Sequence, residues 1–95
     1  MTEHEFNTTI HAPNRLQICA TLAANSSVEF LTLKQQLDVS DSALSKHIKT
    51  LEDAGYVVVE KKASSGRQRT WLSLSKAGLE AFEGHVGALK AIVGQ

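Results

Sequence analysis

The chain has few cysteines and prolines: Cys19 and Pro13 are the only ones among its 95 residues. One cysteine can form no internal disulfide, and it cannot supply the four ligands of an ordinary zinc site. No apolar run approaches the roughly 18 to 20 residues that a membrane-spanning helix needs. We therefore expect no disulfide, no metal site and no membrane partner, and a fold that is stabilised by packing alone.

The amino-terminal segment, residues 1–9, carries Glu3 and Glu5 and lacks the basic start and apolar stretch of a secretory signal. We therefore expect a cytoplasmic protein. The same nine residues are the stretch expected to be disordered. Residues 10–95 are enough for one compact domain, and no linker divides them.

Chemistry-bearing motifs are also missing. The sequence contains no glycine-rich phosphate loop and no nucleophile motif, and its histidines are scattered without ligand spacing. These are His4, His11, His47 and His85. Cys19 has only Arg15 as a basic neighbour at helical spacing, so a small buried hydrophobe is favoured over a redox sensor. The sequence predicts neither an enzyme nor a cofactor.

The formal net charge is zero, which is unusual for a nucleic-acid-binding domain. The distribution of charge is more informative, because basic residues outnumber acidic ones between residues 46 and 76. The basic residues there are Lys46, Lys49, Lys61, Lys62, Arg67, Arg69 and Lys76, against Glu52, Asp53 and Glu60. A surface that attracts nucleic acid needs such a local surplus.

Helical spacing dominates the first half of the chain. Pro13 suits the first turn of a helix, which the apolar spacing extends to about Ala24. A second helix is expected from Phe30 to about Asp38. The preceding residues 28–30 could form either a very short strand or a linker.

A third helix is expected to follow at once. Ser40 is a good N-cap, and the helix should end near Ala54, just before Gly55. Its apolar stripe consists of Leu44, Ile48 and Leu51. Two helices joined by a turn of about three residues match the helix-turn-helix pattern.

The periodicity then changes from helix to strand. Tyr56 to Lys62 and Gln68 to Leu74 flank the turn-prone Ser64, Ser65 and Gly66, which predicts a β-hairpin with a basic tip. Ser75 can cap a last helix from Lys76 to about Val93.

Two stretches resemble a known family. Ser40 to Val57 resembles the recognition helix and following strand of MarR/ArsR-type winged-helix regulators. Gly66 to Gly78 resembles their wing, third strand and the start of the last helix. The resemblance implies an α+β, mainly α, winged helix-turn-helix fold with three helices, a hairpin wing and a C-terminal dimerisation helix. It also implies a homodimeric, DNA-binding regulator of transcription.

This chain departs from the family in two respects. It lacks the paired cysteines of the metal-sensing members, and it is too short for the long terminal helices that enclose an effector pocket in large members. Neither metal sensing nor a small-molecule effector is implied.

The predicted recognition helix turns its leucines and isoleucine inward and Lys46 outward. Short polar side chains and lysines on that outward side suit a major groove. The candidate DNA contacts are Ser42, Ala43, Ser45, Lys46, His47, Lys49 and Thr50. For His47, a phosphate contact and simple packing at the edge of the core are both open. Asp53 is expected to keep the far end of the helix away from DNA.

The hairpin supplies the second group of candidate contacts. Arg67 and Arg69 share one face of their strand, and arginine suits phosphates and narrow minor grooves. The candidate wing residues are Lys62, Ser64, Ser65, Arg67 and Arg69. Solvated charges without a partner remain an alternative, for the hairpin and for the helix.

The last helix carries two apolar sides. One consists of larger residues (Leu79, Phe82, Val86, Leu89 and Val93) and the other of small ones (Ala77, Ala81, Gly84, Ala88 and Ala91). We expect one side to pack on its own domain and the other on a partner helix, without the sequence deciding which. The candidate dimer residues are Leu16, Phe82, Val86, Leu89, Ile92 and Val93. A two-fold dimer would place two recognition helices about one DNA turn apart.

One competing function remains. A winged-helix module that binds protein and not DNA would also explain the neutral net charge.

Overall fold

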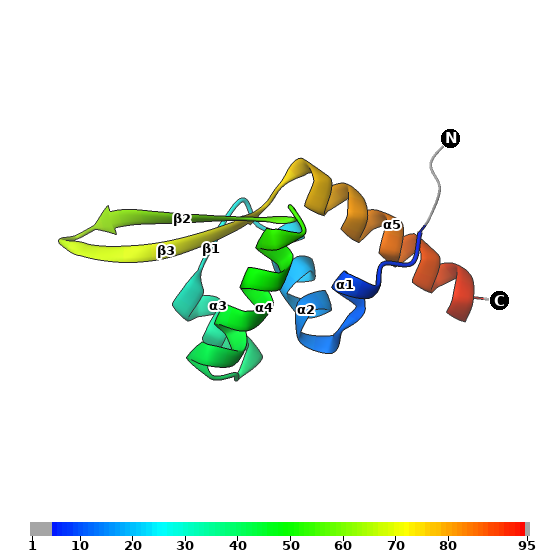
Figure 1. The fold of residues 1–95 in the computed structure, drawn as a ribbon, viewed down its shortest axis with the longest axis horizontal. Coiled ribbons are helices and arrows are strands. Elements are labelled where there is room, and N and C mark those ends of the chain that lie inside the picture. The colour runs from blue at the N-terminus through cyan, green and yellow to red at the C-terminus, as the bar shows by residue number, and fades with distance from the viewer. Residues whose placement is uncertain (1–4, 95) are drawn as a thin grey trace.

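The computed structural model describes residues 5–94, which form helices and one small sheet (Figure 1). The elements follow in the order α1 (Thr8–His11), α2 (Pro13–Ala23), β1 (Val28–Glu29), α3 (Phe30–Leu37), α4 (Asp41–Asp53), β2 (Val57–Ser64), β3 (Arg67–Leu74) and α5 (Lys76–Val93). Helices α1 to α4 form a cluster, from which the β2–β3 hairpin and the end of α5 project in opposite directions (Figure 1). The predicted helix-turn-helix followed by a hairpin and a last helix is confirmed.

The sheet is antiparallel, with strand order β1-β3-β2. Its longest pairing runs from Val57 opposite Leu74 to Ser64 opposite Arg67. Ser65 and Gly66, with φ angles of 53° and 77°, form the two-residue turn between them. Positive φ at both turn residues fits the right-handed twist of the strands. The stretch at residues 28–30 that the sequence left open begins as a strand, β1, which pairs with β3.

The core lies between the helical cluster and the base of the sheet. It contains the inward stripe of α4 predicted from the sequence, Leu44, Ile48 and Leu51. Ile18 of α2, Leu33 of α3 and Leu72 of β3 are fully buried around it. Cys19 is also fully buried, and burial raises the pKa of its thiol to about 11, with Arg15 opposing the shift. A thiol in this environment is a poor nucleophile, as expected for a buried hydrophobe.

The helix-turn-helix is fixed at its turn. The Ser40 hydroxyl accepts a hydrogen bond from the Ala43 backbone N–H at 3.1 Å, which confirms the predicted cap. Asp38 adopts a left-handed conformation with φ of 54° at the end of α3. Lys34 Nζ lies 2.7 Å from Asp41 Oδ1 and joins the two helices across the turn.

The segment before α2 differs from the expectation. Residues 1–4 of the segment expected to be disordered lie outside the described part, and Asn7, Thr8 and Thr9 begin a short helix, α1, that the sequence did not predict. The Asn7 side chain accepts a hydrogen bond from the Ile10 backbone N–H at 2.9 Å and caps α1. Ile10 is fully buried in the core and holds this short helix in place.

Helix α5 packs on its domain through a face that lies between its two apolar sides, and Ala81 of one side and Phe82 of the other both contact the core. The side that faces its own domain carries Gly78, His85 and Ala88, all buried. Of the larger residues, Leu79 and Val93 are 39% and 78% exposed, whereas Phe82, Val86 and Leu89 are half-buried. None of the helices in residues 5–94 combines the length and apolar character needed to cross a membrane.

Candidate nucleic-acid interface

Helix α4 presents a polar side to solvent. Its buried stripe fixes its rotation, so the opposite side is accessible. The exposed candidates are Ser42, Ser45, Lys46, Lys49 and Thr50, whereas Ala43 and His47 are half-buried. The short side chains of Ser42 and Ser45 leave room for close approach to a groove.

The two lysines of α4 differ in their partners. Lys49 Nζ lies 3.1 Å from Asp53 Oδ1, and the hydrogen bond to this carboxylate raises the pKa of Lys49. Lys46 has no carboxylate partner within residues 5–94. Lys46 is therefore the cation of α4 whose charge is not already neutralised.

His47 lies on the edge of α4 that faces α2. Its Nδ1 atom is 3.3 Å from Arg15 Nη1. Desolvation, Arg15 and Lys46 together lower the pKa of His47, so the neutral ring is favoured. His47 is half-buried beside Arg15, which brings to α4 a basic group that sequence reasoning missed.

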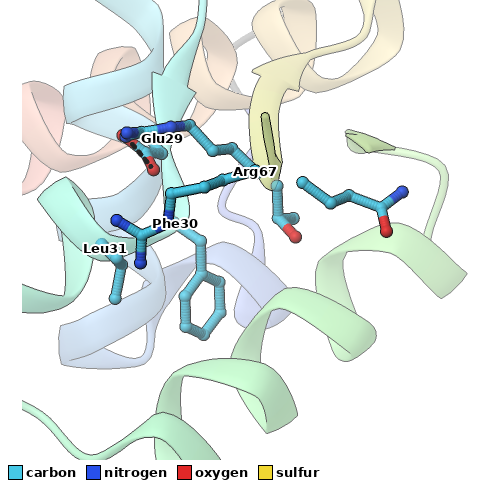
Figure 2. Close-up of a pocket in the computed structure, with 7 residues that line it drawn as sticks. Glu29, Phe30, Leu31 and Arg67 are labelled. Carbon is cyan, nitrogen blue, oxygen red and sulfur yellow. Dashed lines mark hydrogen bonds and ion pairs between the residues drawn. The ribbon is translucent and has the colours of Figure 1, made fainter. Parts of the chain in front are cut away.

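In the wing, defined here as residues 57–74, most charged side chains are exposed to solvent. Lys62, Ser64, Ser65 and Arg67 are exposed, and Lys62 Nζ is 3.8 Å from Glu60 Oε1. Arg67 forms no ion pair in the described part of the chain. Figure 2 shows its side chain directed toward Phe30 and Leu31 at the start of α3, where these residues line a shallow pocket.

Arg69, a candidate DNA contact of the wing, is bound within the chain in the structure. Its Nη1 atom donates to both carboxylate oxygens of Glu29, at 3.1 and 3.0 Å. Glu29 is largely buried, with 15% of its side chain exposed. Arg69 therefore binds β3 to β1 at the base of the wing, and its charge is neutralised within the protein. Sequence reasoning missed Glu29, because β1 was not established from the sequence.

Replacing Glu29 by glutamine is expected to lower the free energy of unfolding by about 1 kcal/mol. Glutamine has nearly the same shape as glutamate, but it lacks the negative charge that pairs with Arg69. Removal of one carboxylate should also tighten duplex binding at low salt. Denaturant unfolding and fluorescence anisotropy measure the two effects. Glu60→Gln is the matched control, since its side chain is exposed and its lysine partner is distant. Equal stability of both variants and the unmodified protein would contradict the anchoring role.

A groove of about 410 Å³ separates α4 from the sheet. Ser45, Lys49 and Glu52 border it on the helix, and Lys61 and Thr70 border it on the wing. Its floor is apolar and consists of Phe30, Ile48, Val59 and Leu72. Lys61 is exposed and has no carboxylate partner among the described residues, so it adds a third available cation that the sequence had not singled out.

A family model described as "Winged helix DNA-binding domain" matches residues 14–93. The chain belongs to the winged helix DNA-binding domain family. An uncharacterized protein of Methanocaldococcus jannaschii is 33% identical to it over 72 residues, which cover 76% of this chain and 78% of that protein.

Solved structures of other proteins share the fold. A transcriptional regulator homologue from Pyrococcus horikoshii OT3 has a TM-score of 0.86 and 28% identity, covering 90% of this chain and 85% of its own. Reduced HlyU from Vibrio cholerae N16961 has a TM-score of 0.68 and 28% identity, and the match covers 92% of this chain and 83% of the HlyU chain.

The candidate dimer residues of this winged helix fall into two groups. Leu16 and Phe82 are half-buried and pack against the core of their own chain. Val86 and Leu89 are half-buried on α5, while Ile92 and Val93 are exposed near its end. These last four side chains have surface available for a second molecule.

Proposed function

We propose that this winged helix is a MarR/ArsR-type transcriptional regulator that binds specific double-stranded DNA sequences as a cytoplasmic homodimer. The amino-terminal half of α4 enters the major groove, and the wing contacts the adjacent backbone or minor groove. No metal, cofactor or small-molecule effector is part of the proposal.

The available cations carry this proposal. Lys46 of α4 and Lys61 and Arg67 of the wing are exposed and have no carboxylate partner within residues 5–94. Two nearby acidic residues are paired within the protein, Asp53 with Lys49 and Glu29 with Arg69. A neutral chain therefore still offers a positively charged surface to phosphates.

The salt dependence of duplex binding tests the proposal. If each subunit of a dimer uses these three cations, log Kobs should fall against log salt with a slope of about −5, from a slope of about −0.9 per phosphate. A duplex selected from random DNA, measured by fluorescence anisotropy, is the ligand. Absence of duplex binding at low salt would favour a module that binds protein.

Single substitutions separate base reading from phosphate contact. Lys46→Ala should reduce the preference for the selected site over random DNA, as expected for a base contact worth about 1–3 kcal/mol. Arg67→Ala should weaken binding to all sequences and make the salt slope shallower by about one for each contact. Lys76→Ala, an exposed lysine outside α4 and the wing, is the control and should change neither quantity.

A further inference from the structure

Residues 5–12, here called the strap, lie across the domain and include α1, which contacts α2, α4 and α5. Ile10 of the strap is fully buried in the core. The Asn7 backbone N–H donates to His85 Nδ1 of α5 at 2.9 Å, and its side-chain amide donates to the Tyr56 hydroxyl at 3.0 Å. A helix of four residues is not stable alone, so α1 depends on these attachments.

The hydrogen bonds of the strap fix the position of every proton on two histidine rings. Because the Asn7 N–H can only donate, His85 Nδ1 must accept, and the proton of the neutral His85 ring is on Nε2. That Nε2 atom lies 3.1 Å from His11 Nδ1, which must therefore accept as well. The closed strap thus requires both rings to be neutral.

One further proton on this pair breaks an attachment of the strap. A proton on His85 Nδ1 faces the Asn7 N–H, and a proton on His11 Nδ1 faces the His85 Nε2–H. Moving the His85 proton from Nε2 to Nδ1 relieves the second conflict only by creating the first. In either case two donors are left pointing at each other in a place with little water, since His85 is fully buried.

No acidic group is placed to stabilise the extra proton. Within residues 5–94, no carboxylate forms an ion pair with either ring. Glu5 of the strap is exposed, and Glu83, two residues from the α5 histidine, is on the other side of that helix. The acidic residues of α4 are placed elsewhere: Asp41 and Asp53 pair with lysines, and Glu52 borders the groove beside the sheet.

The basic groups of the neighbouring elements oppose the extra proton. Helix α2 carries Arg15, α4 carries Lys46 and His47, and the charged residues of β3 are arginines. Burial, followed by the neighbouring His11, lowers the pKa of His85, in agreement with this arrangement. A proton is therefore bound more readily when the strap has left the domain.

We propose that the strap is a proton-operated latch: one proton bound by the His11–His85 pair releases residues 5–12, while residues 13–94 stay folded. The core of the remaining part does not need the strap, apart from the site that Ile10 fills, because its other buried residues come from α2 to α5 and the sheet. The release itself does not depend on the proposed DNA binding.

The strap also holds a basic group beside α4. The Thr9 backbone oxygen accepts a hydrogen bond from Arg15 Nε, and Arg15 Nη1 lies 3.3 Å from His47 Nδ1 of α4. When the strap leaves, Arg15 loses the carbonyl that holds it, and its guanidinium is free to turn next to α4. The latch therefore links the protonation of a ring on α5 to the surroundings of the helix proposed to bind DNA.

Amide hydrogen exchange of the full chain, followed by NMR and corrected for the intrinsic effect of pH, tests the release. Protection of the Asn7 amide should fall about tenfold or more between pH 7.5 and pH 5.5, because a free histidine with a pKa of about 6.5 gains a proton over this range. At both pH values Asn7 should be less protected than Ile48 and Leu51, which lie in the core on α4 and exchange only when the domain opens.

Three histidine variants assign the effect. His85→Phe fills the space without a titrating group, so protection of Asn7 should be low and independent of pH, and the fluorescence of Trp71 checks that this variant is folded. His11→Gln, at an exposed position, keeps an acceptor and removes one titrating ring, so the fall should be smaller. His47→Gln is the matched control: its ring is outside the strap contact, and the full fall should remain.

The outcomes decide between a latch and simple acid unfolding. Equal protection of Asn7 and of the two α4 amides at both pH values would show that the strap opens only when the whole domain unfolds, and would overturn the proposal. Constant protection of Asn7, a fall as large in His11→Gln as in the unmodified protein, or a fall abolished by His47→Gln would overturn it as well. Because the measurement contains no DNA, none of these results bears on the proposed function.

Discussion

Replacement of Gly78 by alanine is expected to lower the free energy of unfolding by about 1–3 kcal/mol, the usual cost of overpacking a tight contact. A Cβ atom at this position would lie 2.1 Å from the Tyr56 backbone oxygen. That oxygen also accepts the Ser75 backbone N–H at 2.9 Å, so it cannot shift without disturbing the start of α5. The clash therefore outweighs the gain of about 1 kcal/mol that alanine usually brings inside a helix.

Thermal or denaturant unfolding measures this effect, and Glu80→Ala is the matched control. Glu80 is exposed on the same helix, so its replacement should leave stability nearly unchanged. A Gly78→Ala protein as stable as the Glu80→Ala control would show that the backbone of Tyr56 can move away.

Replacement of His85 by alanine should cost about 2–4 kcal/mol, because it opens a cavity and leaves a buried N–H without an acceptor. His85 is fully buried, and its Nδ1 accepts the Asn7 backbone N–H at 2.9 Å. The proton of the neutral ring is then on Nε2, which donates to His11 Nδ1 at 3.1 Å. The Phe6 ring contacts both histidine rings, at centroid distances of 4.7 Å.

The same environment makes this anchor sensitive to acid. Burial, followed by the neighbouring His11, lowers the pKa of His85. The unfolded chain therefore binds the proton more readily than the folded chain, and the contribution of His85 to stability is lost as pH falls below the ordinary histidine value of about 6.5. Unfolding measured at pH 7.5 and pH 5.5 should show this loss.

His85→Phe provides the comparison, since it fills the space without a titrating group. The pH dependence of this variant should be smaller than that of the unmodified protein, with the remainder due to His47, whose pKa is also lowered. An identical pH dependence in both proteins would show that His85 does not contribute to it.

The sequence predicted the fold where local signals and apolar spacing agree. Ser40 and Ser75 were identified as caps, and the structure shows both hydroxyls accepting the expected backbone N–H groups. The inward stripe of α4 was equally clear, because a spacing of three and four residues fits one face of a helix.

The contacts that the sequence did not reveal join residues far apart in the chain. Glu29 and Arg69 are 40 residues apart, and His11 and His85 are 74 residues apart. No periodicity within a single element reports such pairs. They depend on how β1 meets β3 and how α5 crosses the amino-terminal segment. For this reason the sequence suggested only a DNA contact for Arg69 and no role for His85.

The ion pair between Lys34 and Asp41 gives the helix-turn-helix a further property. Together with the left-handed turn at Asp38, it links α3 to α4 at the angle that the structure shows without a ligand. A recognition helix that is already oriented in this way loses no binding free energy to ordering when DNA binds. In the proposed DNA complex, an α4 held at this angle would tilt less toward an ill-fitting base pair, and the turn would then add to the discrimination that the side chains of α4 supply.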